Sequence, residues 1–475
     1  MSRPSLSRRT FLQIVIVPAS VGLLAACGGA TAPPVSTSPV AAGAVPTKVT
    51  APPTVASTTA TVATQATSAP AAAQGAGNTL TVLSWSTPDT VGRQVDDKEL
   101  TEYGKAHNVT IKGQDVPFGE YLRKLQTMFA ANVAPDVLWD SIWRQGPFVK
   151  AGALVPLDDL AAKDQNLPKY KSVALDMGKY GGKLYGLPTA ASTWVLYFNS
   201  DLFTAAGLPT PIEMQAAKKW TWESCLDAAQ KMTKTAGGRT TQYGYMTDPQ
   251  YYTWATYAYN NGGEVLNKEK TKFLVNTPET TNALQWLADM IVKLKASPTV
   301  TDQQQEGYVP RFASGKLGMM TTWAGTGIDI QKAAPNKFKW DVIAAPETKR
   351  TGGYWHANLI NINSKTKDKD NAWGVCKLLS SLDIEKKRLE AGISNTPLID
   401  DPELIKVYGK SMPMANAKVV IDLLDASIPL PYNDNWEEQR FKVLEPFMQK
   451  VYAGDTTAAA GMPEVQKQLD ALLPT

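Results

Sequence analysis

Short apolar runs alternate with amphipathic stretches from residue 79 onward. Residues 80–83 form a short apolar run, and residues 109–116 alternate between apolar and polar side chains. Both patterns are typical of strands. Residues 121–129 place five apolar side chains on one helical face, and 135–139 predict the next strand. Because strand and helix keep alternating at this spacing, we expect an α/β body with a largely parallel sheet.

The second half of the chain carries clearer signals for helix starts. Thr221 can cap a helix that has Glu223 in its first turn. Thr277 precedes Pro278, which suits the first helical position. Further elements are predicted as strands at 317–322, 338–344 and 359–362, and as helices at 372–382, 436–453 and 463–473.

The N-terminus has the layout of an export signal. Residues 1–9 are basic, residues 11–26 are mostly apolar, and Cys27 follows. Ser7-Arg8-Arg9-Thr10-Phe11-Leu12 resembles the twin-arginine export motif, and Leu24-Ala25-Ala26-Cys27 resembles the lipobox of bacterial lipoproteins. We therefore expect residues 1–26 to be a cleaved signal peptide and Cys27 to be the lipidated N-terminus. The alternative is an uncleaved N-terminal anchor.

Residues 28–78 consist almost entirely of Ala, Thr, Pro, Ser, Val and Gly, with Lys48 as the one charged side chain. Such a stretch cannot bury enough surface to offset the entropy of ordering it. We expect 27–78 to be a lipidated, disordered tether that carries a folded body spanning residues 79–475.

Charge and residue counts exclude several classes of protein. The chain has 48 basic and 44 acidic residues, formally +4, and loss of the arginines at 3, 8 and 9 with the signal leaves +1. A nearly neutral body argues against a nucleic-acid partner. With two histidines and three cysteines, a zinc site or a disulfide scaffold is not expected, and neither is a cofactor. Cys225 and Cys376 lie on apolar helical faces and are expected to be buried free thiols, a disulfide between them being the alternative.

Five short motifs, taken in order, resemble the extracellular solute-binding proteins of ABC importers, in the carbohydrate-binding branch that includes maltose-binding protein. The motifs are Tyr121-Leu122-Arg123-Lys124-Leu125 with Ala134-Pro135-Asp136-Val137, Tyr185-Gly186-Leu187-Pro188 with residues 196–203, Thr221-Trp222-Glu223, Asn261-Gly262-Gly263, and residues 312–319.

The resemblance implies a two-lobe periplasmic-binding-protein-like α/β fold with a ligand cleft between the lobes. Lobe 1 would comprise about 79–190 and 325–362, and lobe 2 about 195–322 and 365–475, with hinge strands near 188–199 and 346–363. It also implies a monomer without enzymatic activity. Such a protein would capture a carbohydrate, close around it, and deliver it to ABC permease subunits at the extracytoplasmic face of the cell membrane.

Sugars present C–H patches and rims of hydroxyls, so a sugar site needs flat aromatic platforms with polar side chains around them. Of the 13 tryptophans, those beside turns or strand ends are candidate platforms, with core packing as the alternative for each. They are Trp85, Trp139, Trp143, Trp254, Trp323, Trp355 and Trp436. Trp85 and Trp139 also lie at carboxyl ends of predicted strands, where α/β sheets bind ligands.

The family pattern implies further ligand contacts. It assigns stacking aromatic rings at Tyr251, Trp323 and Trp436, an acidic ligand at Asp89, and polar contacts in the loop carrying Asp140 and Arg144. Gly325 ends the segment around Trp323, and His356 follows Trp355 at the start of an apolar strand. The sequence departs from the family pattern at one position. The acidic residue that serves as a ligand in the family's crossover strand falls near Ser192, where this chain has no acid.

The alternative to a binding protein is an exported, lipid-anchored enzyme that hydrolyses glycans, because two suitably placed carboxylates would suffice for that reaction. A sensor that presents its loaded body to a membrane receptor is a third hypothesis. Neither a nucleophile elbow nor a convincing phosphate-binding loop occurs in the sequence.

Overall fold

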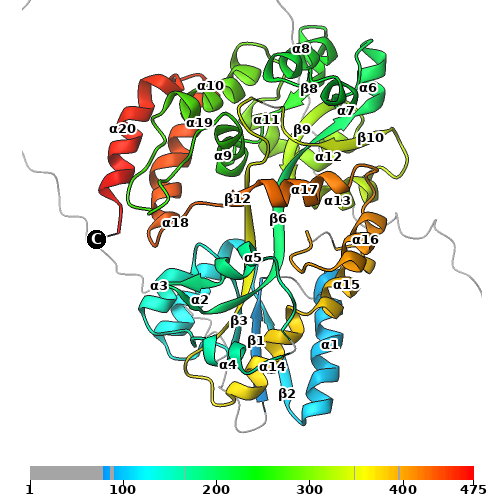
Figure 1. The fold of residues 1–475 in the computed structure, drawn as a ribbon. Helices are drawn as coiled ribbons and strands as arrows, with labels where there is room; N and C mark the ends of the chain where they lie inside the picture. Colours follow the sequence, from blue (N-terminus) through cyan, green and yellow to red (C-terminus); the bar gives the residue numbers. More distant parts are fainter. Residues whose placement is uncertain (1–78, 86–89, 166, 347, 394–395, 475) are drawn as a thin grey trace, which may run out of the picture. The chain divides into compact units, whose positions relative to one another are not determined.

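The computed structural model describes residues 79–474 except 86–89, 166, 347 and 394–395 (Figure 1). The predicted signal peptide, the lipidated cysteine and the tether therefore lie outside the described residues, as does Asp89. All described residues belong to one compact unit. Within it, none of the helices combines the length and the apolar character needed to cross a membrane.

The described chain contains twelve strands, with helices between them. The strands are β1 (Thr79–Ser84), β2 (Thr110–Asp115), β3 (Val137–Ser141), β4 (Lys179–Tyr180), β5 (Lys183–Leu184), β6 (Gly186–Asn199), β7 (Lys234–Ala236), β8 (Arg239–Met246), β9 (Leu317–Trp323), β10 (Trp340–Ile343), β11 (Tyr354–Ile362) and β12 (Ile428–Pro429).

The helices follow the same labels as Figure 1. They are α1 (Val91–His107), α2 (Phe118–Ala130), α3 (Gln145–Lys150), α4 (Asp158–Ala162), α5 (Ser172–Met177), α6 (Ser200–Ala205), α7 (Pro211–Ala216), α8 (Trp222–Met232), α9 (Tyr251–Asn260), α10 (Pro278–Val292), α11 (Val300–Gln305), α12 (Tyr308–Ala313), α13 (Thr326–Ala333), α14 (Lys369–Leu379), α15 (Leu382–Glu390), α16 (Pro402–Ser411), α17 (Lys418–Ala426), α18 (Trp436–Gln439), the π-helix η1 (Arg440–Leu444), α19 (Glu445–Ala453) and α20 (Ala458–Ala471).

One long strand joins two groups of strands. The order is β2-β1-β3-β11-β6-β9-β8-β7, with β10 on β6 and β12 on β11. The 14-residue β6 pairs with β11 through residues 186–193 and with β9 and β10 through residues 194–199. We call β1, β2, β3 and β11 the first strand group and β7–β10 the second. β6 passes from one to the other, as Figure 1 shows.

The expectation of a largely parallel sheet is wrong, because the sheet is mixed. β1 is parallel to β2 and β3, and β8 is parallel to β9. The two longest strands, however, are antiparallel to each other, and β6 is also antiparallel to β9 and β10. Local alternation of strands and helices predicts parallel pairing between neighbours in sequence. Here β6 and β11 find partners far away along the chain instead.

The predicted helix starts are confirmed. Thr277 accepts a hydrogen bond from the N–H of Thr280 at the start of α10, and Thr221 caps α8 in the same way. The predicted helix 436–453 is interrupted by η1, which ends just before Pro446 in the first turn of α19. Proline has no N–H and displaces the carbonyl four residues earlier, which accounts for the widened turn. The last helix begins at Ala458, five residues before the predicted start.

A β-bulge interrupts the regular pairing of β6 with β11. Asn358 faces Ala190 and Leu359 faces Pro188, so Thr189 is the extra residue. The Thr189 hydroxyl donates to the carbonyl of Leu379 at 2.7 Å and accepts from Arg388 at 2.9 Å. The bulge is thereby tied to α14 and α15, which pack beside the first strand group.

Arg388 is the buried anchor of this arrangement. Its Nε and Nη2 lie 2.9 and 2.8 Å from Oδ1 of Asp96, with side chains only 2% and 7% exposed. Burial raises the pKa of Asp96, and the arginine opposes that rise. The pair therefore joins α15 to α1 through a desolvated charge contact.

The cysteine prediction is also confirmed. Cys225 and Cys376 are both buried free thiols. The Cys376 thiol lies 3.2 Å from the carbonyl of Ile360 and donates to it. Burial raises the pKa of both thiols, so neither has the thiolate character that reactivity requires.

We predict that Arg388→Ala lowers the free energy of unfolding by about 3–5 kcal/mol, because it leaves the Asp96 carboxylate buried without its counter-ion. The measurement is urea unfolding at pH 7, followed by tryptophan fluorescence. Lys442→Ala serves as the control, because it removes an exposed ion pair with Glu438 and should leave the midpoint unchanged. Equal midpoints for the two variants would contradict the prediction.

Candidate ligand-binding site

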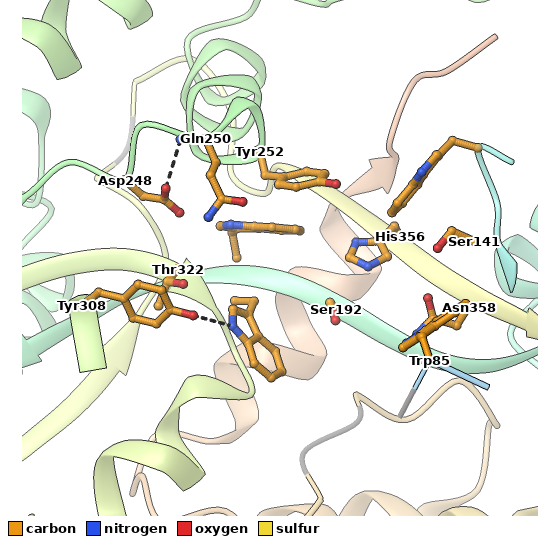
Figure 2. A pocket seen from close by; sticks show the side chains of 13 residues that line it. Trp85, Ser141, Ser192, Asp248, Gln250, Tyr252, Tyr308, Thr322, His356 and Asn358 are labelled. Carbon is orange, nitrogen blue, oxygen red and sulfur yellow. Dashed lines mark hydrogen bonds between the residues drawn. The ribbon is translucent and has the colours of Figure 1, made fainter. Parts of the chain in front are cut away.

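A cavity of about 490 Å³ lies where β6 passes between the two strand groups. Aromatic side chains make up much of its wall, and the remaining lining residues are polar (Figure 2). The lining residues are Trp85, Ser141, Trp143, Ser192, Trp194, Asp248, Gln250, Tyr252, Tyr308, Thr322, Trp323, His356 and Asn358.

The floor of the cavity is set by strand register. Residues directly opposite each other in an antiparallel pair point to the same face of the sheet, as do residues two apart on one strand. Three such cross-strand pairs contribute lining side chains across β9, β6, β11 and β3. They are Trp323 with Trp194, Ser192 with His356, and Asn358 with Ser141.

An aromatic cluster rises from this floor. The Trp194 and Tyr252 rings are stacked with centroids 4.9 Å apart and planes 23° apart. His356 lies 6.1 Å from Tyr252 at 27°, and the Trp143 ring meets His356 edge-on at 5.1 Å. Tyr252 comes from the first turn of α9, and Trp143 from the turn between β3 and α3. Four segments distant in sequence therefore build one wall.

Arg440 stands beside Tyr252 and outside the cavity lining. Its Nη1 donates to the Tyr252 hydroxyl at 2.8 Å, and its guanidinium carbon lies 4.6 Å from the ring centroid. Nε of Arg440 forms an ion pair with Oε1 of Glu445 at 2.8 Å. Because the tyrosine oxygen accepts from Arg440, its own hydrogen remains available to an acceptor in the cavity.

Asp248 and Tyr308 line the opposite end (Figure 2). The Asp248 carboxylate accepts from the N–H of Gln250 at 3.0 Å and from the Thr253 hydroxyl at 3.4 Å. Burial raises its pKa to about 6, against the effect of these hydrogen bonds. The Trp323 Nε1 donates to the Tyr308 hydroxyl at 3.3 Å, which fixes the indole against α12.

Apart from Asp248, the described lining of the cavity carries no charge near neutral pH. Burial lowers the pKa of His356 to about 4, and the positive charge of Arg440 adds to the effect. Among the described lining residues, Asp248 is the one carboxylate, and none is a lysine or an arginine. The cavity is thus suited to a polar ligand without net charge, held by stacking and by neutral hydrogen bonds.

A second cavity, of about 560 Å³, adjoins the first and shares Trp85, Trp323 and Asn358 with it. Charged side chains line this second cavity: Arg93, Asp96, Asp329, Lys332 and Arg388. The Arg388 guanidinium lies 5.3 Å from the Trp139 ring centroid. A ligand that left the first cavity past Trp85 and Trp323 would enter this more polar space.

The structure brings together part of the predicted site. Of the predicted residues, four line the first cavity: Trp85, Trp143, Trp323 and His356. Trp139 and Gly325 line the second. Asp140 and Arg144 are buried and line neither cavity. Burial raises the pKa of Asp140 to about 7, and Arg144 forms an ion pair with Glu437 at 3.6 Å.

The other predicted aromatic residues lie in the hydrophobic core, outside the cavity linings described above. They are Tyr251, Trp254, Trp355 and Trp436, each at most 1% exposed. The Tyr251 and Trp436 rings meet edge-on at 4.8 Å, and the Trp254 Nε1 donates to the carbonyl of Thr280 at 2.9 Å. Their ligand contacts remain predictions, made from motif position for Tyr251 and Trp436 and from a place beside a turn or strand end for Trp254 and Trp355.

Several lining residues were not among the predicted ones, including Trp194, Tyr252, Tyr308 and Asn358. A period of two along the strands was the available signal. On β6 and β11 it places Trp194 on the same face as Ser192, and Asn358 on the same face as His356. Tyr252 is separated from Tyr251 by about 100° around the helix, so one faces the cavity and the other the core.

The sequence profile of the family described as "Bacterial extracellular solute-binding protein" matches residues 87–382. A putative binding protein of Brucella abortus (strain 2308) is 28% identical over 385 residues, which cover 79% of this chain and 89% of the relative.

Two solved structures are similar in fold. One is an ABC substrate-binding protein from Listeria monocytogenes in complex with cycloalternan, with a TM-score of 0.73, 24% identity, and coverage of 83% of this chain and 98% of that chain. The other is the GacH receptor of Streptomyces glaucescens, solved unliganded and with acarbose. It has a TM-score of 0.71 and 21% identity, and the match covers 84% of this chain and 99% of that chain.

We predict that Asp248→Asn removes one contribution to the pH dependence of stability. The folded-state pKa is about 6 and the unfolded one about 3.9, so the folded chain binds this proton more tightly. The contribution to stability is therefore fully present below about pH 4 and is lost as pH rises to about 6. Between pH 4.5 and 7, the wild type should lose more stability than Asp248→Asn.

Urea unfolding at several pH values measures this difference. Asp227→Asn is the matched control, because Asp227 is half exposed and pairs with Lys231 on the surface. Identical pH profiles for Asp248→Asn and the wild type would contradict the assignment.

Proposed function

The chain belongs to the bacterial extracellular solute-binding proteins, and on that premise we propose that it captures a carbohydrate in the cavity beside β6 and delivers it to an ABC importer. Its two-lobe α/β fold is that of sugar-binding members with solved structures. The observation that carries the proposal is the row of stacked aromatic rings and neutral polar groups on one face of β9, β6, β11 and β3.

Each part of the row suits a part of a sugar. Trp194 and Trp323 offer flat faces to the C–H patches of a pyranose ring, and Tyr252, stacked against Trp194, offers its hydroxyl. Ser192 and Asn358 offer hydroxyl and amide groups to its rim. The relatives support the same class of ligand, because cycloalternan and acarbose are the compounds named for the two similar structures.

The finer assignments extend the same proposal. Residues 1–26 direct export and are removed, Cys27 carries the lipid, and residues 27–78 hold the folded body away from the extracytoplasmic membrane surface. Lobes 1 and 2, with the bounds given above, close around the sugar by bending at β6 and β11. The loaded protein then docks as a monomer on the permease subunits.

Hydrolysis of the bound glycan is the alternative. Retaining and inverting glycosidases generally use a pair of carboxylates about the scissile bond. Among the described residues, the first cavity offers Asp248 alone. Incubating the purified protein with mixed glycans and assaying new reducing ends tests this alternative directly, and turnover would favour it over simple capture.

We predict that a neutral oligosaccharide from a carbohydrate panel raises the melting temperature, because a ligand that binds only the folded state stabilises it, by ~2.7 kcal/mol at a hundred times Kd. Trp323→Ala should weaken binding at least tenfold with little loss of stability, since the indole is partly exposed in the cavity. The measurements are thermal shift and calorimetric titration.

Trp254→Ala is the contrasting variant. Its indole is fully buried in the core, so the substitution should lower the free energy of unfolding by about 3–5 kcal/mol. If no carbohydrate shifts the melting temperature of the wild type, or if Trp323→Ala binds as tightly as the wild type, the proposed site is wrong.

We also predict that Cys27→Ala moves the protein from the membrane fraction to the soluble fraction, because the substitution removes the acylated thiol. Cell fractionation and the mass of the N-terminal peptide measure this outcome. Cys225→Ala is the control, since its thiol is buried in the folded body. Equal membrane association of both variants would argue against lipid anchoring.

A further inference from the structure

The centre of the cavity floor consists of neutral polar side chains, a feature that bears on which carbohydrate fits. Ser192 on β6 lies directly opposite His356 on β11, and Asn358 follows two residues later on the same face. All three line the first cavity (Figure 2). A charged side chain at position 192 would point into the cavity. The serine found there leaves this part of the floor uncharged.

Two further polar atoms at this place lack hydrogen-bond partners among the described residues. Nδ1 of His356 and Oγ of Ser141 are both buried without a partner. Ser141 lies opposite Asn358 on β3 and is 0% exposed. A buried polar atom without a partner is unfavourable by about 1–3 kcal/mol, and a hydroxylated ligand could relieve it.

The surroundings of His356 keep its ring neutral. Tyr252 from α9 and Trp143 from the β3–α3 turn pack against the imidazole, and Arg440 from η1 stands behind Tyr252. Arg144, which follows Trp143 in sequence, pairs with Glu437. The positive charge of Arg440 opposes a further positive charge on the imidazole, while Glu445 compensates the arginine itself.

The row is also longer than one sugar ring. It crosses from β9 through β6 and β11 to β3, which is three inter-strand steps of ~4.8 Å, or roughly 14 Å. Aromatic residues stand at both ends, Trp323 and Trp194 at one and Trp143 with Trp85 at the other. The polar pairs lie between them.

We propose that the Ser192–His356 pair determines specificity, and that the ligand is an uncharged saccharide of more than one unit lying along this row. Stacking at the two ends holds successive rings, and Ser192, His356 and Asn358 bond the hydroxyls between them. Carboxylated and amino sugar units are disfavoured at this pair, because the floor there would desolvate their charge without supplying a counter-ion. The one carboxylate of the described lining, Asp248, lies at the other end of the cavity (Figure 2) and accepts from Gln250 and Thr253. This inference rests on the proposed function and deepens it.

The test compares three ligand classes by calorimetric titration at pH 7. They are a length series of neutral oligosaccharides, the same oligosaccharides with one uronic acid unit, and the same with one amino sugar unit. The wild type should bind a neutral oligosaccharide at least tenfold more tightly than either charged analogue, and more tightly than the corresponding monosaccharide.

Substitutions at the floor should change this preference. Ser192→Asp places a carboxylate opposite His356, so the ratio of amino-sugar to neutral affinity should rise at least tenfold and uronate binding should fall further. Ser200→Asp is the control, because Ser200 begins α6 outside the cavity and tolerates an acid at a helix start. A packing defect alone would not change the ratio between ligands of different charge.

His356→Leu removes hydrogen bonding at similar volume and should weaken neutral ligand three- to tenfold, which corresponds to one net hydrogen bond. His356→Gln keeps a neutral hydrogen-bonding group and should recover part of that loss. His107→Gln, on the exposed end of α1, should leave binding unchanged.

The possible results separate the two proposals. Binding of a charged sugar as tightly as the neutral one, binding of a monosaccharide as tightly as the oligosaccharide, or an unchanged charge preference in Ser192→Asp overturns this inference and leaves carbohydrate capture intact. Absence of binding for every saccharide overturns the proposed function itself.

Discussion

The antiparallel register of β6 is the constraint on which the site depends. Residues 186–193 of this strand pair with β11 and residues 194–199 with β9 and β10, so a single backbone carries side chains into both strand groups. Alternation along the strand then brings Ser192 and Trp194 to the same face. A one-residue slip in the pairing of β6 would turn Ser192 and Trp194 away from the cavity. Thr193 and Val195, which are both buried, would take their place.

The β-bulge at Thr189 makes such a slip unfavourable. Its hydroxyl bonds Leu379 and Arg388, and Arg388 in turn is paired with Asp96 on α1. Moving β6 by one residue would break the hydrogen bonds that tie Thr189 to Leu379 and Arg388, as well as the strand ladder. Stability far from the cavity and geometry inside it are therefore linked by the same strand.

Local signals in the sequence were enough to place some of the elements. Helix caps at Thr221 and Thr277 and the apolar run after residue 79 act over a few residues, which is why they could be recognised without the fold. The pairing partners of β6 and β11 could not be recognised, since both strands pair with segments far away in sequence. The expected parallel sheet was wrong for this reason.

The site shows the same limit at the scale of single residues. Motif similarity led to Tyr251, but its neighbour Tyr252 lines the cavity. Of the two adjacent candidates on β11, His356 lines the cavity and Trp355 is buried in the core. On a strand, adjacent residues face opposite sides, and on a helix they are about 100° apart. An assignment that is correct to within one position therefore fails to say which ring faces the ligand, and only the three-dimensional packing decides it.

Charge is arranged in layers around the cavity. Arg440, Arg144 and Asp140 all lie behind the lining, where salt bridges or burial hold them. The lining itself offers aromatic faces, hydroxyls, two amides, a neutral imidazole and one carboxylate, Asp248, which accepts from Gln250 and Thr253. Because Arg440 bonds the Tyr252 hydroxyl and packs against its ring, it can orient this ring without itself lining the cavity. A site built this way gains its selectivity from shape and from neutral hydrogen bonds, and attraction between opposite charges contributes little to it.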